Sequence, residues 1–116
     1  MKLTFIQTRT FVSLLNHCGL SDRELRHLEQ SLLENPQGGR VMRNTGGVRK
    51  VRFAPPSLRS GKSGGLRICY FYFPKYATVC FVLLFPKSEQ PNLTPVQEKV
   101  CRLLSRQIEE AFEKTS

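Results

Sequence analysis

The sequence predicts an α+β domain in which a small, mainly antiparallel sheet carries its helices on one face. Apolar residues recur at helical spacing near both ends of the chain. Between these ends lie short runs rich in aromatic and β-branched residues, separated by glycine and proline. The runs follow one another closely enough to pair as antiparallel neighbours. The length of 116 residues fits one domain spanning 1–116.

The first third of the chain predicts one strand and two helices. Leu3–Gln7 is expected to be a short opening strand, and Thr10–Cys18 a helix because its apolar residues share one face. A second helix begins after Ser21, since Ser21 and Glu24 have the spacing of a capping box. Asn, Pro and two Gly within residues 35–39 end that helix.

Three strands are predicted next. Val48–Ala54 alternates between its two faces, and Pro55–Gly65 is expected to be a long loop. Leu66–Phe73 and Ala77–Phe85 are apolar and aromatic, and Pro74-Lys75 turns the chain between them.

The last element is a helix with clear start signals. Thr94 has the position of an N-cap, Pro95 that of the first helical residue, and Gln97 completes a capping box. The predicted order is β-α-α-β-β-β-α. Helices on one face would leave the other face free to present basic side chains.

Charge is segregated along the sequence. The formal net charge is +9, from 18 basic and nine acidic residues. No Asp or Glu occurs between Asn35 and Ser88, whereas ten basic residues do: Arg40, Arg43, Arg49, Lys50, Arg52, Arg59, Lys62, Arg67, Lys75 and Lys87. A positive field confined to one segment indicates a polyanionic partner rather than a generally soluble surface.

Several other functional classes are disfavoured. The longest apolar run, Tyr76–Phe85, is too short to cross a bilayer, and the N-terminus lacks the apolar region of a secretory signal, so a cytoplasmic protein is expected. The four cysteines show no ligand or disulfide spacing and are expected to be small core residues. Two histidines, His17 and His27, lie in the helical first third, away from the basic segment, and build neither a triad nor a metal site.

The glycine-rich segment Ser60–Gly65 resembles the end of a phosphate-binding P-loop. The complete motif needs glycine where this chain has Pro56, and a helix where Leu66–Phe73 reads as a strand. Nucleoside triphosphate binding is therefore rejected. A basic loop that contacts a nucleic-acid backbone and a plain hairpin connection both remain open.

Two groups of cations are candidates for binding phosphate. On a strand, Lys50 and Arg52 share one face and Arg49 takes the other. The pair could bind phosphate or form the ordinary polar face of a sheet. Arg67 is the only charged residue in its strand, which points to an anionic partner.

The blocks at residues 44–54, 60–71, 83–89 and 92–97, taken in order, closely resemble the HigB branch of the RelE toxin superfamily. The resemblance implies a RelE-like fold and the toxin of a type II toxin–antitoxin system. Such a toxin is an endoribonuclease that cuts mRNA in the ribosomal A site. A helix-turn-helix antitoxin (HigA-like) silences it, and it needs no cofactor or metal.

This chemistry uses the nucleophile that RNA carries. The 2′-hydroxyl attacks the adjacent phosphate and leaves a 2′,3′-cyclic phosphate. Cations stabilise the phosphorane and proton carriers assist. The expected catalytic residues are Lys62, Arg67, Lys87 and Glu89. The expected RNA-binding residues are Arg49, Lys50, Arg52 and Arg59.

Three alternatives stay open at the level of sequence. The first alternative is a toxin of the same fold that poisons DNA gyrase, as the ParE branch does. A double-stranded RNA-binding domain would need lysines at the start of its last helix, where this chain has Thr94-Pro95-Val96-Gln97-Glu98. A degenerate toxin would bind the ribosome without cutting.

Overall fold

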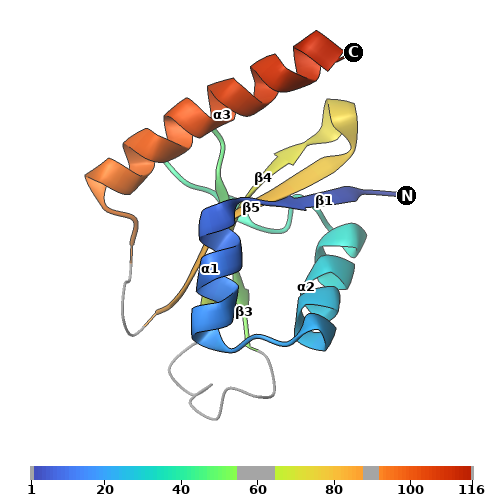
Figure 1. The fold of residues 1–116 in the computed structure, drawn as a ribbon, viewed down its shortest axis with the longest axis vertical. Coiled ribbons are helices and arrows are strands. Elements are labelled where there is room, and N and C mark those ends of the chain that lie inside the picture. The colour runs from blue at the N-terminus through green and yellow to red at the C-terminus, as the bar shows by residue number, and fades with distance from the viewer. Residues whose placement is uncertain (1, 55–64, 88–91, 116) are drawn as a thin grey trace.

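The computed structural model describes residues 2–54, 65–87 and 92–115. Five strands form one sheet in the order β1-β5-β4-β3-β2, and three α-helices pack against it (Figure 1). The elements run in the order β1 (Thr4–Gln7), α1 (Arg9–Cys18), α2 (Asp22–Glu34), β2 (Arg40–Val41), β3 (Arg49–Phe53), β4 (Leu66–Phe73), a 3-10 turn (Pro74–Tyr76), β5 (Thr78–Pro86) and α3 (Pro95–Thr115). The predicted α+β class is confirmed.

The centre of the sheet has the predicted pairing. β3, β4 and β5 are antiparallel neighbours, because short connections return the chain beside itself. Two features were not predicted: the two-residue strand β2, which pairs with β3, and the parallel pairing of β1 with β5. A bulge leaves Val82 of β5 without a partner in β4.

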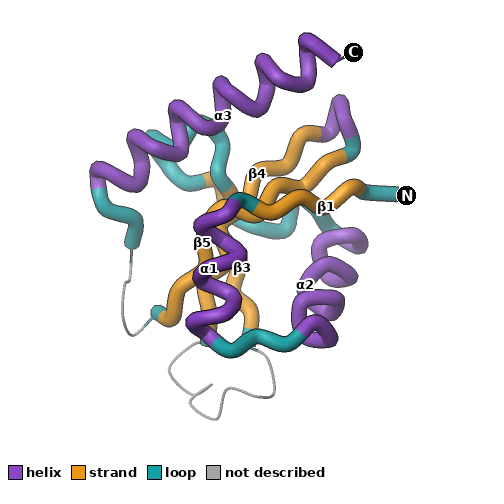
Figure 2. Tube along the Cα trace, viewed as in Figure 1, coloured by secondary structure: helices purple, strands orange, loops and turns teal. Residues whose placement is uncertain are grey.

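The prediction that the helices share one face of the sheet is wrong. Phe11 of α1 and Leu28 of α2 pack with Ile68 of β4 in one core. Phe71 of β4 and Cys101 of α3 belong to a second core on the opposite face. Figure 2 shows α3 across the sheet from α1 and α2. The apolar stripe of α3 required a buried face, but its spacing did not specify which one.

A tight turn holds α3 on its face of the sheet. Arg102 donates a hydrogen bond to the carbonyl of Asn44 (2.6 Å), and the Ser105 hydroxyl donates to that of Gly46 (3.0 Å). A Cβ on Gly46 would lie 3.0 Å from that of Ser105, and Gly46 has φ +76°. The Thr-Gly-Gly block of the sequence is therefore a helix-docking turn.

Tyr70 fixes the chain that leaves α2. Its buried hydroxyl donates to the carbonyl of Pro36 (2.8 Å) and accepts from the N–H of Gly39 (3.0 Å). Burial raises the pKa of this phenol, although its bond with Gly39 acts in the other direction. The turn is thereby fixed against β4, and β2 follows it directly.

Candidate functional site

Four cations share one face of the sheet. The register places Arg40 of β2 opposite Lys50 of β3, and Arg52 of β3 opposite Arg67 of β4. Directly opposite residues of an antiparallel pair project from the same face. Lys50 is also opposite Cys69, which belongs to the core beneath α3, so this is the α3 face. We call these four residues the basic row: Arg40, Lys50, Arg52 and Arg67.

Both pairs in the basic row place like charges opposite each other. Such pairs destabilise a sheet, because their Cβ atoms lie only about 5 Å apart. An anion between the members of each pair would reverse the sign of this interaction. Four cations on one face therefore form a candidate site for an anionic ligand.

A cavity of about 290 Å³ adjoins one end of the basic row. Arg40, Arg43 and Lys50 line one side, and Leu93 and Glu98 line the other. Glu98 lies in the first turn of α3, where the helix dipole favours a carboxylate. Three cations against one acid leave the cavity positive. Sequence reasoning missed Arg40 as a site residue, because only the pairing of β2 brings it opposite Lys50.

Arg49 lies on the opposite face from Lys50 and Arg52, the other described members of the predicted RNA-binding set. It pairs with Tyr70, whose ring belongs to the core beneath α1 and α2. Its guanidinium donates to the carbonyls of Gly39 (2.8 Å) and Gln37 (3.2 Å). The alternation predicted for Arg49 and Lys50 is confirmed, and it assigns Arg49 to the turn that Tyr70 also holds.

The remaining predicted residues are only partly placed. Lys87 is exposed directly after β5, and its N–H donates to the carbonyl of Gly65 (3.3 Å), just before Arg67 in β4. Lys87 and Arg67 thus lie at the same end of the sheet. Arg59, Lys62 and Glu89 lie outside the described residues, as does most of the predicted loop Pro55–Gly65.

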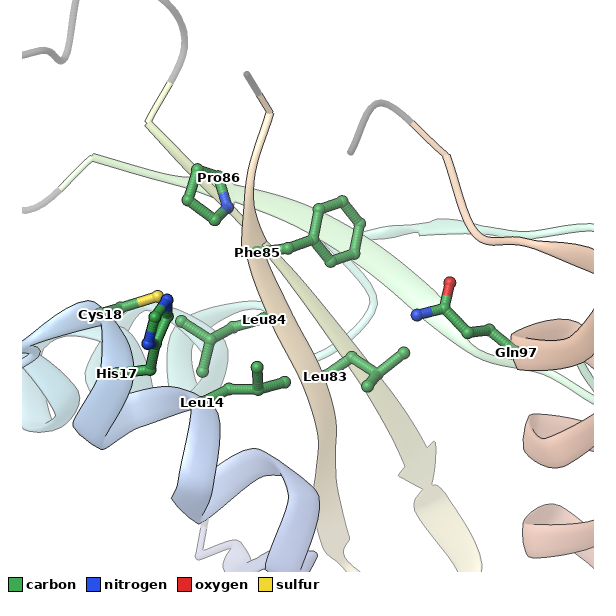
Figure 3. Close-up of a pocket in the computed structure, with 8 residues that line it drawn as sticks. All are labelled: Leu14, His17, Cys18, Leu83, Leu84, Phe85, Pro86 and Gln97. Carbon is green, nitrogen blue, oxygen red and sulfur yellow. The ribbon is translucent and has the colours of Figure 1, made fainter. Parts of the chain in front are cut away.

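A second cavity, of about 300 Å³, lies at the end of β5 (Figure 3). Phe85, the partner of Arg67 across the β4–β5 pair, lines it together with Leu14 and His17 of α1 and Gln97 of α3. Phe85 points toward α3, whereas His17 lies on the side of α1. The sequence placed His17 in the helical first third, away from the basic segment. It lines a cavity with Phe85 only because α1 packs against β5 in the folded protein.

The cysteines are core residues, as predicted. Cys69, Cys80 and Cys101 are buried in the core beneath α3, and Cys18 is half-buried. Burial raises the pKa of Cys69 to about 12 and that of Cys80 to about 11, with the neighbouring Cys101 adding to the shift of Cys69. Thiols so strongly protonated are poor nucleophiles. Although Cys69 lies opposite Lys50, its thiol is a packing group of the core and not a reactive one.

The described part of the chain contains neither a metal-binding cluster nor a membrane-spanning helix. Within residues 2–54, 65–87 and 92–115, no cluster of three His, Cys, Asp or Glu side chains has a geometry suited to a metal ion. In the same part of the chain, every helix is too short or too polar for a bilayer span.

Comparison with known proteins identifies the architecture. No protein-family model matches this chain. Among solved structures, the chain is similar to a double arginine-to-alanine mutant of the E. coli toxin RelE in the free state. The TM-score is 0.52 at 16% sequence identity, over 78% of this chain and 90% of that one. At this identity the likeness concerns the fold, and we conclude that the chain has the fold of the RelE toxin.

Proposed function

We propose that the protein is the toxin of a type II toxin–antitoxin system, of the HigB type, and that it cuts mRNA on the ribosome. The observation that carries the proposal is the basic row, in which Arg40 lies opposite Lys50 and Arg52 lies opposite Arg67 on one face of the sheet. The similarity in fold to the toxin RelE supports it. The phosphate backbone of RNA is the anionic ligand that we propose for this row of cations.

In the proposed reaction the RNA supplies its own nucleophile. The 2′-hydroxyl attacks the adjacent phosphorus, the bond to the 5′-oxygen breaks, and a 2′,3′-cyclic phosphate and a 5′-hydroxyl result. Arg67 binds the phosphorane oxygens through its planar guanidinium, and Lys87 adds charge from the same end of the sheet. Arg40, Lys50 and Arg52 hold the flanking backbone.

Two further candidates for proton transfer are proposed from the sequence alone. Lys62 and Glu89, which lie outside the described residues, belong to the segments that join β3 to β4 and β5 to α3. A lysine crowded by cations has a lowered pKa, which suits it to carry a proton. Arg59 lies in the same segment as Lys62 and is proposed to contact the RNA backbone.

The proposed partners follow from this activity. They are the ribosomal A site with its mRNA, in the bacterial cytoplasm, and a helix-turn-helix antitoxin of the HigA kind. An antitoxin that covers the basic row would block ribosome binding, because the positive field steers the toxin to RNA. The purified complex is therefore expected to bind ribosomes much more weakly than the free toxin does.

The test separates catalysis from binding. Arg67→Ala removes the contact to the phosphorane but leaves most of the positive field. We expect cleavage on programmed ribosomes to fall roughly a hundredfold or more, and ribosome affinity to fall only modestly. Lys75→Ala is the control, because Lys75 is exposed in the turn at the other end of β4.

Two outcomes would contradict the proposal. If Arg67→Ala loses activity only in proportion to lost binding, the basic row is a docking surface without catalysis. If induction of the wild-type chain leaves mRNA 5′ ends unchanged but breaks DNA, the chain acts on gyrase.

A further inference from the structure

We infer that the cavity lined by His17 and Phe85 holds one nucleobase of the RNA, from a nucleotide flanking the cleaved phosphate. The inference rests on the proposed function and extends it to base selection. We call this space the edge cavity. Its lining residues are Leu14, His17, Cys18, Leu83, Leu84, Phe85, Pro86 and Gln97.

The edge cavity arises because β5 extends beyond its neighbour. β1 pairs with β5 only from Thr78 to Phe81, and α1 begins two residues after β1 ends. The last part of β5, as far as Pro86, therefore has a strand on its β4 side only. Figure 3 shows the last turn of α1 on one side of the end of β5 and Gln97 of α3 on the other, and the lining of the edge cavity comes from all three elements.

The lining suits a flat, partly polar ring. Leu14, Leu83 and Phe85 offer apolar surface, and His17 offers a ring that stacks or forms a hydrogen bond. Gln97 is held in place at the rim, because its Oε1 accepts the N–H of Thr94 (2.9 Å). A volume of about 300 Å³ is at the small end for a ligand pocket and accommodates a single base.

The position of the edge cavity fits a mechanical need of the reaction. In-line attack requires the 2′-oxygen, the phosphorus and the 5′-oxygen to align, which a stacked A-form strand does not allow. One flanking base must leave the stack, and enzymes receive such a base in a pocket. Phe85, which lines the edge cavity, is directly opposite Arg67, the proposed phosphate clamp.

The experiment fills the edge cavity from its exposed side. His17→Trp places a larger ring there without burying new polar groups, since His17 is exposed on α1. The matched control is His27→Trp, which changes the other histidine of the chain at an exposed position on α2, outside the lining. Cleavage and ribosome affinity are measured on ribosomes that carry mRNAs differing only in the bases flanking the cut.

We expect His17→Trp to lower the cleavage rate roughly tenfold or more, which corresponds to the loss of one stacked base, while its ribosome affinity stays at the wild-type value. His27→Trp should keep both the wild-type cleavage rate and the wild-type affinity. His17→Ala should lower cleavage less than His17→Trp does, and it should reduce the differences among the flanking bases. If His17→Trp and His17→Ala cut with wild-type rates and preferences, the edge cavity binds no base and the proposed function still stands. If the wild type itself cuts no mRNA, the proposed function fails and the inference fails with it.

Discussion

At the scale of the single residue, two arginines of β3 have different roles. Arg52 lies opposite Arg67 in the basic row, whereas Arg49 bonds to two carbonyls of the turn after α2. Arg52 places a second positive charge opposite Arg67, whereas Arg49 fixes the turn after α2. Their effects on stability should therefore have opposite signs.

Arg52→Gln should stabilise the protein and weaken its binding to RNA. Removing one of two opposed like charges raises the free energy of unfolding by about 0.2–1 kcal/mol, while one phosphate contact is lost. Urea denaturation measures the first effect, and ribosome binding at fixed salt measures the second.

Arg49→Gln is the matched comparison. It should lower the free energy of unfolding by about 1 kcal/mol, because the carbonyls of Gly39 and Gln37 lose a charged donor. RNA affinity should change less than in Arg52→Gln. Equal losses of affinity in the two variants would mean that RNA contacts both faces of the sheet.

The buried thiols make stability depend on alkaline pH. The pKa of Cys69 is about 12 and that of Cys80 about 11, above the value of about 8.5 for a cysteine in an unfolded chain. The folded state thus retains protons that the unfolded state releases, and stability is lost as pH rises. Urea midpoints should be constant up to about pH 8 and fall steadily above it. Cys69→Ala should reduce that slope.

At the scale of elements, the attachment of α3 depends on one turn. Gly46→Ala combines the strain of a positive φ with a Cβ contact to Ser105 at 3.0 Å. Gly19→Ala meets similar strain, at φ +69°, with no atom within 4 Å. Gly46→Ala should therefore destabilise the protein by more than the ~1 kcal/mol expected for Gly19→Ala. Urea denaturation of both variants gives the difference, and equal values would show that the turn does not clamp α3.

Local signals in the sequence predicted most of the elements. The capping boxes at Ser21 and Thr94 are present, and β4 has its predicted limits, because these features depend on residues close together in the chain. The side chosen by α3 was not predictable, since an amphipathic stripe packs equally well on either apolar face.

The candidate site was less accessible to sequence reasoning. Lys50, Arg52 and Arg67 stood out by charge, and strand alternation separated Arg49 from them. Arg40 and His17 did not stand out, because each reaches the site through a pairing or packing between elements distant in sequence.

At the scale of the whole molecule, the charged residues that the structure describes are distributed unevenly between the two ends of β4. The basic row and Lys87 lie toward the start of β4, whereas two acids and one base, Glu109, Glu113 and Lys75, lie together at the turn at its far end. Phe73 is six positions after Arg67 in β4, so the two ends are roughly 20 Å apart along the strand. Such a dipole turns the basic row toward a polyanion during the encounter.

Binding should consequently depend steeply on salt. If the four cations of the basic row each contact a phosphate, log K for single-stranded RNA falls against log salt with a slope of about −3. Fluorescence titrations between low and moderate salt measure the slope. A value near zero would exclude the basic row as the binding surface.

The parallel strand β1 also delays the completion of the sheet while the protein is being synthesised. Thr4 pairs with Thr78, and the Thr8 hydroxyl donates to the carbonyl of Val82, 74 positions later. The first residues made therefore wait for β5 before the sheet closes, and contacts of such long range slow folding. A chain still being translated lacks its completed sheet, so the fold closes only after most of the chain has been made.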